Sequence, residues 1–239
     1  VRFFGDPTPI QRNYLLKEFC ENAKVEGFRA SVHIQVGAAD PVAEAMWIDS
    51  IAEANPDWPL VQVVHCDLTS STLDKDLDLF QTIPSIRGVR QIVGRSSEED
   101  TKSGTNDLLS SSAFCDGIAE LGNRNLSFDL QLTPELIEQA ANVLSAAPQT
   151  KTALCHAGSP GDRSEQGLAK WSKNLRLLSN IENVFCKISG LGMFDHGWTQ
   201  NSITPIINEC IDQFGSSRCM FGSNFPVDSL YSDYSSLIQ

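Results

Sequence analysis

Short runs of apolar, β-branched residues alternate along the chain with longer segments whose apolar residues recur every three or four positions. The first pattern is typical of buried strands and the second of amphipathic helices. The expected strands are the segments 28–36, 60–67, 86–93, 126–132, 151–156, 184–189 and 218–221. The expected helices are the segments 10–25, 73–80, 108–121, 168–178 and 204–214, with two more that begin at Asp40-Pro41 and at Thr133. This alternation predicts βα units around a parallel sheet.

Local signals place the ends of several elements. Pro41 suits the first position of a helix, and Thr133 suits an N-cap. Gly122 is expected to end the helix before it as a C-cap. The polar segment 94–106 and the Gly/Ser/Pro-rich segment 158–167 are both expected to be loops.

Two architectures fit this rhythm, a (β/α)8 barrel and an open doubly wound sheet. No strand is followed by a GxGxxG fingerprint or by P-loop spacing, which an open nucleotide-binding sheet would favour. We therefore predict a (β/α)8 TIM barrel whose first strand and last helix are missing from this chain. No shift in composition marks a boundary, so residues 1–239 are expected to form a single domain.

Charge and composition exclude several classes of partner. Thirty acidic residues against 18 basic ones give a net charge of −12, which would repel the phosphates of nucleic acid. No stretch approaches the roughly 18 apolar residues of a membrane span, so no membrane association is expected. The chain has seven cysteines and no CxxC pair. We interpret them as reduced thiols and expect a cytoplasmic protein.

Polar side chains recur where the expected strands end. In a parallel barrel the carboxyl ends of the strands form the mouth at which chemistry occurs. The residues in such positions are His33, Gln35, His65, Asp67, Arg90, Asp129, Gln131, His156, Lys187, Ser189, Asn224 and Asp228. Each could equally be a hydrogen-bonded core residue, a helix cap or a turn residue. Their repetition at nearly every strand predicts that they line one shared cavity.

His156 is the most informative of these residues. The sequence Ala157-Gly158-Ser159-Pro160 after it predicts a tight turn, and an imidazole of ordinary pKa suits proton transfer or metal binding. Arg90 supplies a fixed cation for a carboxylate or a developing oxyanion. Arg163 and His196, in the loops that follow, either line the pocket or are plain surface residues.

Together these segments resemble those of a known family. The matching segments are Phe4-Gly5-Asp6 with Asn13-Tyr14-Leu15, 31–35 with Glu44 and Trp47, 87–90, 126–130, 155–160, Trp171, 186–191, and 214–215 through 218–223. In these segments the chain resembles the amidohydrolase-related family of metal-dependent hydrolases, in particular the branch of sugar-lactone and 2-pyrone-4,6-dicarboxylate lactonases.

The resemblance implies a hydrolase that opens a small, anionic lactone by attack of water on its carbonyl. It places His156, Asn224 and Asp228 in catalysis. The residues expected to bind the substrate are Gln35, His33, Arg90, Asp129, Gln131, Arg163, Lys187 and His196. The wider superfamily implies a divalent metal such as zinc, with His156 as a ligand, although some members of the branch work without one.

Two departures from the family pattern keep alternatives open. The His-x-His motif of the family's first strand is not in this chain. By the family's layout it would fall before Val1, so either this sequence is part of a longer chain or the protein has lost its first strand. Asn224 stands where many relatives carry aspartate, and an amide cannot act as a base. Asp228 could take that role if its loop turns inward. A metal-dependent decarboxylase and a non-catalytic barrel that binds a small ligand are the alternatives, and a homo-oligomer is left open.

Overall fold

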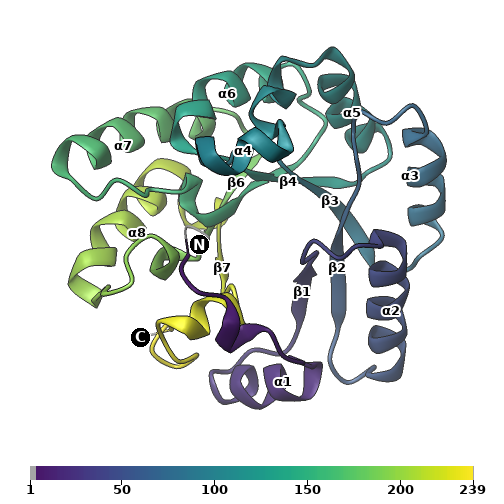
Figure 1. Ribbon diagram of the computed structural model, residues 1–239, viewed down its shortest axis with the longest axis horizontal. Coiled ribbons are helices and arrows are strands. Elements are labelled where there is room, and N and C mark those ends of the chain that lie inside the picture. The colour runs from purple at the N-terminus through teal and green to yellow at the C-terminus, as the bar shows by residue number, and fades with distance from the viewer. Residues whose placement is uncertain (1–3, 239) are drawn as a thin grey trace.

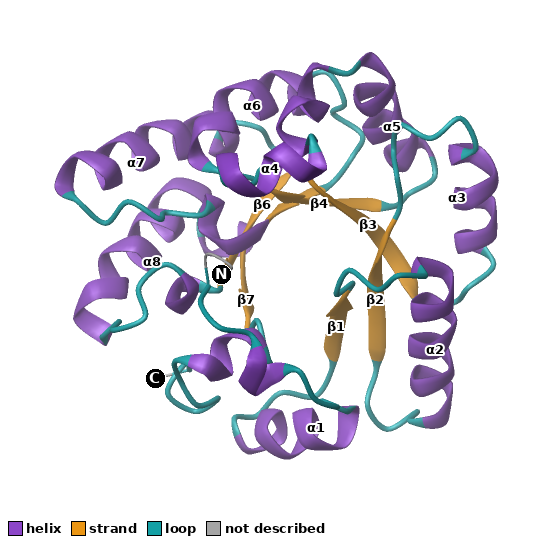
Figure 2. Ribbon diagram, viewed as in Figure 1, coloured by secondary structure: helices purple, strands orange, loops and turns teal. Residues whose placement is uncertain are grey.

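Seven parallel strands form a single sheet in the computed structural model, which describes residues 4–238. The strands are β1 (Ser31–Ile34), β2 (Leu60–His65), β3 (Ile86–Ile92), β4 (Ser127–Gln131), β5 (Thr152–Leu154), β6 (Val184–Ser189) and β7 (Cys219–Gly222). Each strand pairs with the next one in the sequence, and the sheet curls into an open barrel with helices outside it (Figure 1; Figure 2). The predicted α/β barrel architecture is confirmed.

The helices follow the strands in the predicted alternation. They are α1 (Leu16–Val25), α2 (Pro41–Ala54), α3 (Leu73–Gln81), α4 (Ser97–Ser103), α5 (Ser112–Asn123), α6 (Ile137–Ser145), α7 (Glu165–Ser179) and α8 (Gln200–Phe214). Pro41 begins α2 as expected, and the Asp40 carboxylate accepts hydrogen bonds from the Val42 and Ala43 amides at 3.0 and 2.9 Å. Capping of this kind stabilises a helix by about 1 kcal/mol.

The main core lies between the curled sheet and the helices around it. Phe128 and Leu130 of β4 are fully buried there, together with Phe114 of α5 and Leu175 of α7. The apolar runs that predicted the strands are thus explained, because a parallel sheet covered by helices buries nearly all of its side chains. No helix within residues 4–238 combines the length and apolarity needed to cross a lipid bilayer.

Three local predictions were wrong. Residues 97–103 form α4, although the whole segment 94–106 was expected to be a loop. Ser96 caps this helix, three acidic residues occupy its first turn, and Gly104 ends it in the left-handed conformation. These signals favour a helix without any apolar periodicity.

The other two wrong predictions concern helix caps. Gly122 lies inside α5, where a Cβ would approach Thr150 Oγ1 to 2.5 Å, so glycine is needed there for close packing. Thr133 precedes a 3-10 turn, Pro134–Leu136, and its side chain makes no capping hydrogen bond.

An aromatic cluster fills the side of the barrel between β1 and β7, which do not pair with each other in the described part of the chain. Phe28, just before β1, stacks on Phe221 of β7 with ring centroids 5.5 Å apart. Tyr234 of the C-terminal segment packs edge-on against Phe19 of α1, Phe28 and Phe225. The N- and C-terminal segments lie side by side at this opening (Figure 1).

Candidate active site

The chain turns left-handed directly after β5. His156, Ala157, Gly158 and Ser159 have φ angles of 54°, 52°, 70° and 58°. For residues other than glycine this conformation costs roughly 1–2 kcal/mol each. Such strain persists only where the surrounding structure holds it, and it gathers at functional sites. Here the Ser159 amide donates to the His156 carbonyl at 2.8 Å, and the Trp171 indole donates to the Ala157 carbonyl at 2.7 Å.

The turn places the His156 imidazole in a buried position beside β6. Its Nδ1 lies 3.0 Å from Ser189 Oγ. Burial, together with the nearby positive charges of Lys187 and Arg90, lowers the pKa of His156 to about 3. His156 is therefore neutral at physiological pH.

Lys187 of β6 forms an ion pair with Asp129 of β4. Cys155 Sγ lies 3.9 Å from the same Asp129 oxygen, and burial raises the pKa of this thiol, which keeps it protonated. Paired buried charges hold one another in fixed geometry, because separating them leaves an uncompensated charge.

Arg90 joins the ends of three strands. Its Nη2 donates to the Gln35 carbonyl, which follows β1, and its Nη1 donates to Gln131 Oε1 of β4 at 3.3 Å. His65 Nδ1 lies 3.2 Å from the Arg90 carbonyl. The Nε of Arg90 is buried without a partner among the described residues. A buried, unpaired guanidinium donor is a ready contact for an anionic group.

The loop after β7 turns Asp228 inward. Its side chain is 2% exposed, and its Oδ1 accepts a hydrogen bond from Asn224 Nδ2 at 3.0 Å. Burial raises the pKa of Asp228 to about 6, although hydrogen bonds from Asn224 and from the Gly190 amide act in the opposite direction.

Gly190 lies between His156 and the hydrogen-bonded pair of Asn224 and Asp228. A Cβ at this position would lie 2.6 Å from His156 Nδ1 and 3.2 Å from Asn224 Nδ2. Its φ of 62° also favours glycine. Because a Cβ here would collide with His156 and crowd Asn224, glycine permits His156, Asn224 and Asp228 to form one cluster.

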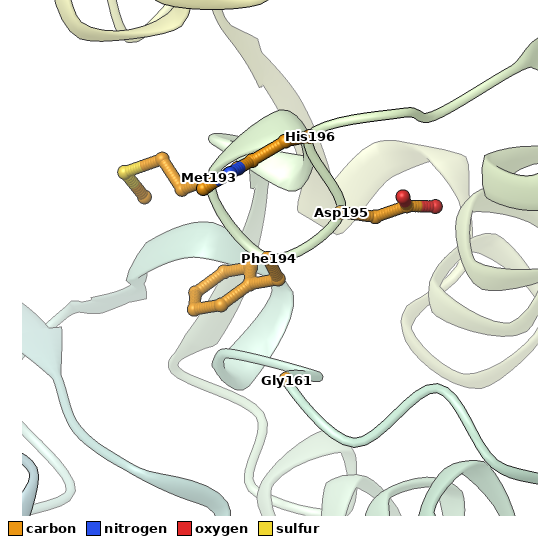
Figure 3. Close-up of a pocket in the computed structure, with 5 residues that line it drawn as sticks. All are labelled: Gly161, Met193, Phe194, Asp195 and His196. Atoms are coloured by element: carbon orange, nitrogen blue, oxygen red, sulfur yellow. The ribbon is translucent and has the colours of Figure 1, made fainter. Parts of the chain in front are cut away.

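A pocket of about 490 Å³ lies between the loop after His156 and the loop after β6. Gly161, Met193, Phe194, Asp195 and His196 line it (Figure 3). The ring of His196 stacks on Tyr231 at 3.8 Å between centroids. The pocket thus combines apolar side chains with a carboxylate and an imidazole.

Arg163 lies near this pocket. Its Nη2 donates to the Leu191 carbonyl at 3.0 Å, and its Nε and Nη1 are buried without a partner among the described residues. Burial lowers the pKa of Arg163. The arginine therefore has two donors available for an acceptor that enters from outside.

An amidohydrolase family model matches residues 15–239 of the chain. The chain belongs to the amidohydrolase family. The uncharacterized protein y4mH of Sinorhizobium fredii is 33% identical over 237 residues, which cover 98% of this chain and 79% of that protein. The L-fucono-1,5-lactonase of Burkholderia multivorans is 29% identical over 132 residues, which cover 51% of this chain and only 44% of that protein. The resemblance recognised in the sequence is confirmed, and this amidohydrolase is a hydrolase.

Solved structures agree with the fold. A crystal structure of an amidohydrolase from Burkholderia multivorans with bound HEPES has a TM-score of 0.83 and 22% identity, covering 98% of this amidohydrolase and 82% of that chain. A second crystal form of an amidohydrolase from the same organism contains bound zinc.

Most of the residues predicted for the site lie in this network of contacts. Arg90 bonds to Gln131 and to the Gln35 carbonyl, Lys187 pairs with Asp129, and Asn224 bonds to Asp228. The charges of Lys187 and Arg90 act on His156, and Gly190 lies between His156 and Asn224. Arg163 and His196 lie outside this network, at or near the pocket described above. His33 also lies outside it, because its Nε2 lies 3.0 Å from Glu44 Oε1 of α2. It therefore supports the loop after β1, where Glu44 also accepts from the Val36 amide.

The sequence did not single out Ser189 as the partner of His156, nor Gly190, Met193 or Phe194. The only local signal was the Ser-Gly pair at the end of an apolar strand, which marks a sharp turn but not what lies across from it.

The described residues do not fit a zinc site by themselves. Within residues 4–238 no three His, Cys, Asp or Glu side chains gather as metal ligands would. His156 lies instead beside the positive charges of Lys187 and Arg90. For this reason we assign no step of the chemistry to a metal.

Proposed function

We propose that this amidohydrolase opens a small lactone by adding water to its carbonyl carbon, and that the lactone carries a negative charge. The observation that supports this most directly is the buried Asp228 carboxylate, held by Asn224 beside a neutral His156. The relatives named as lactonases point to the same bond type.

In this proposal Asp228 is the general base. With a pKa of about 6 it is mostly ionised at neutral pH, yet it is more basic than an ordinary aspartate. It takes a proton from water as the water oxygen bonds to the lactone carbonyl carbon. The tetrahedral intermediate then expels the ring oxygen, which takes the proton back from Asp228.

His156 and Asn224 position the reacting groups. The Nδ1 of His156 faces Ser189, which leaves Nε2 as the nitrogen that meets the water or the carbonyl oxygen. Asn224 cannot accept the proton, but its amide holds the Asp228 carboxylate in place. Arg90 and Lys187 stabilise the oxyanion that forms, since fixed cations aimed at developing charge lower the barrier.

The charge of the substrate follows from the cations around the site. Arg90, Lys187 and Arg163 lie at or near the mouth of a protein whose net charge is −12. Two of these, Arg90 and Arg163, have buried donors without partners among residues 4–238. A carboxylate on the substrate would satisfy such donors.

A panel of lactones tests the proposal. Sugar 1,5-lactones and an unsaturated dicarboxylate lactone are supplied to the purified chain, and acid release is followed with a pH indicator. We expect turnover of at least one anionic member, and a fall of about 10²- to 10⁴-fold in Asp228→Asn. Asp233→Asn is the matched control, because Asp233 is exposed and its carboxylate accepts hydrogen bonds from the neighbouring residues Ser235 and Ser236.

Absence of turnover by folded protein across the panel would contradict the proposal, as would equal activity in the two aspartate variants. The decarboxylase alternative requires a metal site that the described residues do not form by themselves, so it is not proposed.

A further inference from the structure

The left-handed turn that carries His156 is held from outside by one helix. Trp171, on α7, is 3% exposed, and its indole N–H donates to the Ala157 carbonyl at 2.7 Å. Ala157 is itself fully buried, so water cannot replace this donor. The hydrogen bond therefore acts on the residue next to His156 in the middle of the strained turn.

His156 is also held from the opposite side. Ser189 Oγ, at the end of β6, lies 3.0 Å from the imidazole Nδ1. The backbone of His156 thus depends on Trp171, and its ring orientation depends on Ser189. A turn that relaxed toward the right-handed or extended conformation would carry the ring away from Ser189 and from the cluster around Gly190.

We propose that Trp171 is a positioning residue for catalysis: its indole N–H holds residues 156–159 left-handed and so fixes the direction of the His156 imidazole. This inference rests on the proposed function in that His156 is taken to meet the water or the carbonyl. Packing of the Trp171 ring alone would not hold the turn in this way, because a benzene ring could fill most of the same space without donating to the Ala157 carbonyl.

The test compares two tryptophans in matched settings. Trp171→Phe removes the donor and keeps an aromatic ring. Trp58→Phe is the control. Trp58 is also 3% exposed, and its indole also donates a single hydrogen bond, to Ser31 Oγ at 2.8 Å. It belongs to the aromatic cluster, away from His156. We expect kcat to fall about 10²-fold in Trp171→Phe with KM changed little, since small misplacement of a reacting group has effects of that size. Trp58→Phe should keep the wild-type kcat per folded molecule.

The ¹⁵N resonances of the histidine imidazoles give a readout that does not depend on turnover. The chain has four histidines, so the His156 signals are assigned by comparison with His156→Asn. We expect these signals to shift in Trp171→Phe and to stay in place in Trp58→Phe. A shift without any lactone turnover would sustain the positioning role while contradicting the proposed function.

The double variant Trp171→Phe/Ala157→Gly provides a rescue. Glycine adopts the left-handed conformation without a steric penalty, so the turn needs the indole less, and part of the lost kcat should return. If Trp171→Phe alone does not fold, the double variant is used for the test in its place. A folded Trp171→Phe with unchanged kcat and unchanged His156 resonances would overturn the inference, as would a double variant no more active than the single one.

Discussion

Asp228 shows how a single buried carboxylate can set the pH range of the enzyme. Burial raises its pKa to about 6, and His156, with a pKa of about 3, stays neutral over the same range. We therefore expect kcat/KM to rise with pH along a single limb with an apparent pKa near 6. A pH–rate profile between pH 4 and 8 measures it. A limb near pH 4 would show that an ordinary carboxylate, and not Asp228, carries the activity.

The same shift predicts an effect on stability. The pKa of Asp228 is higher in the folded than in the unfolded state, so its ionisation opposes folding above about pH 6 and has no effect below about pH 4. Asp228→Asn should raise the free energy of unfolding at pH 7.5 by about 1–3 kcal/mol, and less at pH 4. Urea unfolding at the two pH values gives the comparison. A variant less stable than wild type at pH 7.5 would mean that the carboxylate is needed for folding.

A substitution of Asn224 distinguishes two hypotheses. Either the amide has a role of its own, or it stands where a catalytic aspartate has been lost. In Asn224→Asp a second carboxylate would take the place of the amide donor that lies 3.0 Å from Asp228 Oδ1. Like charges at this distance raise one pKa strongly. The acid limb should move above pH 6 by about one unit or more, and activity at pH 7 should fall. A large gain in activity would instead favour an inactive barrel that had lost its base.

At the scale of single elements, the left-handed turn after β5 concentrates backbone strain. Ser159→Gly places glycine at a half-buried, left-handed position where serine is strained. We expect it to raise the free energy of unfolding by about 0.5–1 kcal/mol. Gly158→Ala is the reverse change. Its Cβ would find room at 3.4 Å from Ile137 Cδ1, so its loss of stability should reflect the φ of 70°. Equal stability of both variants would show that the turn is not strained.

The elements also show what the sequence can predict. The run 184–189 was predicted with both ends correct, because its apolar residues are typical of a strand buried by helices and its polar residues, Lys187 and Ser189, fall toward the carboxyl end. α4 was missed, because it is largely exposed and has no apolar face; the Ser96 cap, the acidic first turn and Gly104 were the signals that indicated it. The meeting of His156 with Ser189 depends on consecutive left-handed residues, which no periodicity reveals. Strand alternation also does not show that α2 brings Glu44 to His33.

At the scale of the whole molecule, side chains rather than strand pairing join the two ends of the sheet within the part of the chain that the structure describes. The aromatic cluster links α1, the residues before β1, β7 and the C-terminal segment, and Tyr234 at 6% exposure contacts three of its rings. Such a link ties the N-terminal and C-terminal parts of the described chain into one cooperative unit.

Tyr234 should therefore matter to the stability of the entire fold, although it lies far from His156 along the chain. Removing a buried aromatic ring typically lowers the free energy of unfolding by about 3–5 kcal/mol, and each edge-on ring pair adds about 0.5–1.5 kcal/mol beyond the buried area. We expect Tyr234→Ala to lose about 3–4 kcal/mol in urea unfolding. The fluorescence of Trp58, in the same cluster, and far-ultraviolet circular dichroism of the whole sheet should report a single transition. Tyr234→Phe, which keeps the ring, should lose about 1 kcal/mol or less. If Trp58 fluorescence changes well before the circular dichroism in Tyr234→Ala, the cluster unfolds on its own and does not close the barrel.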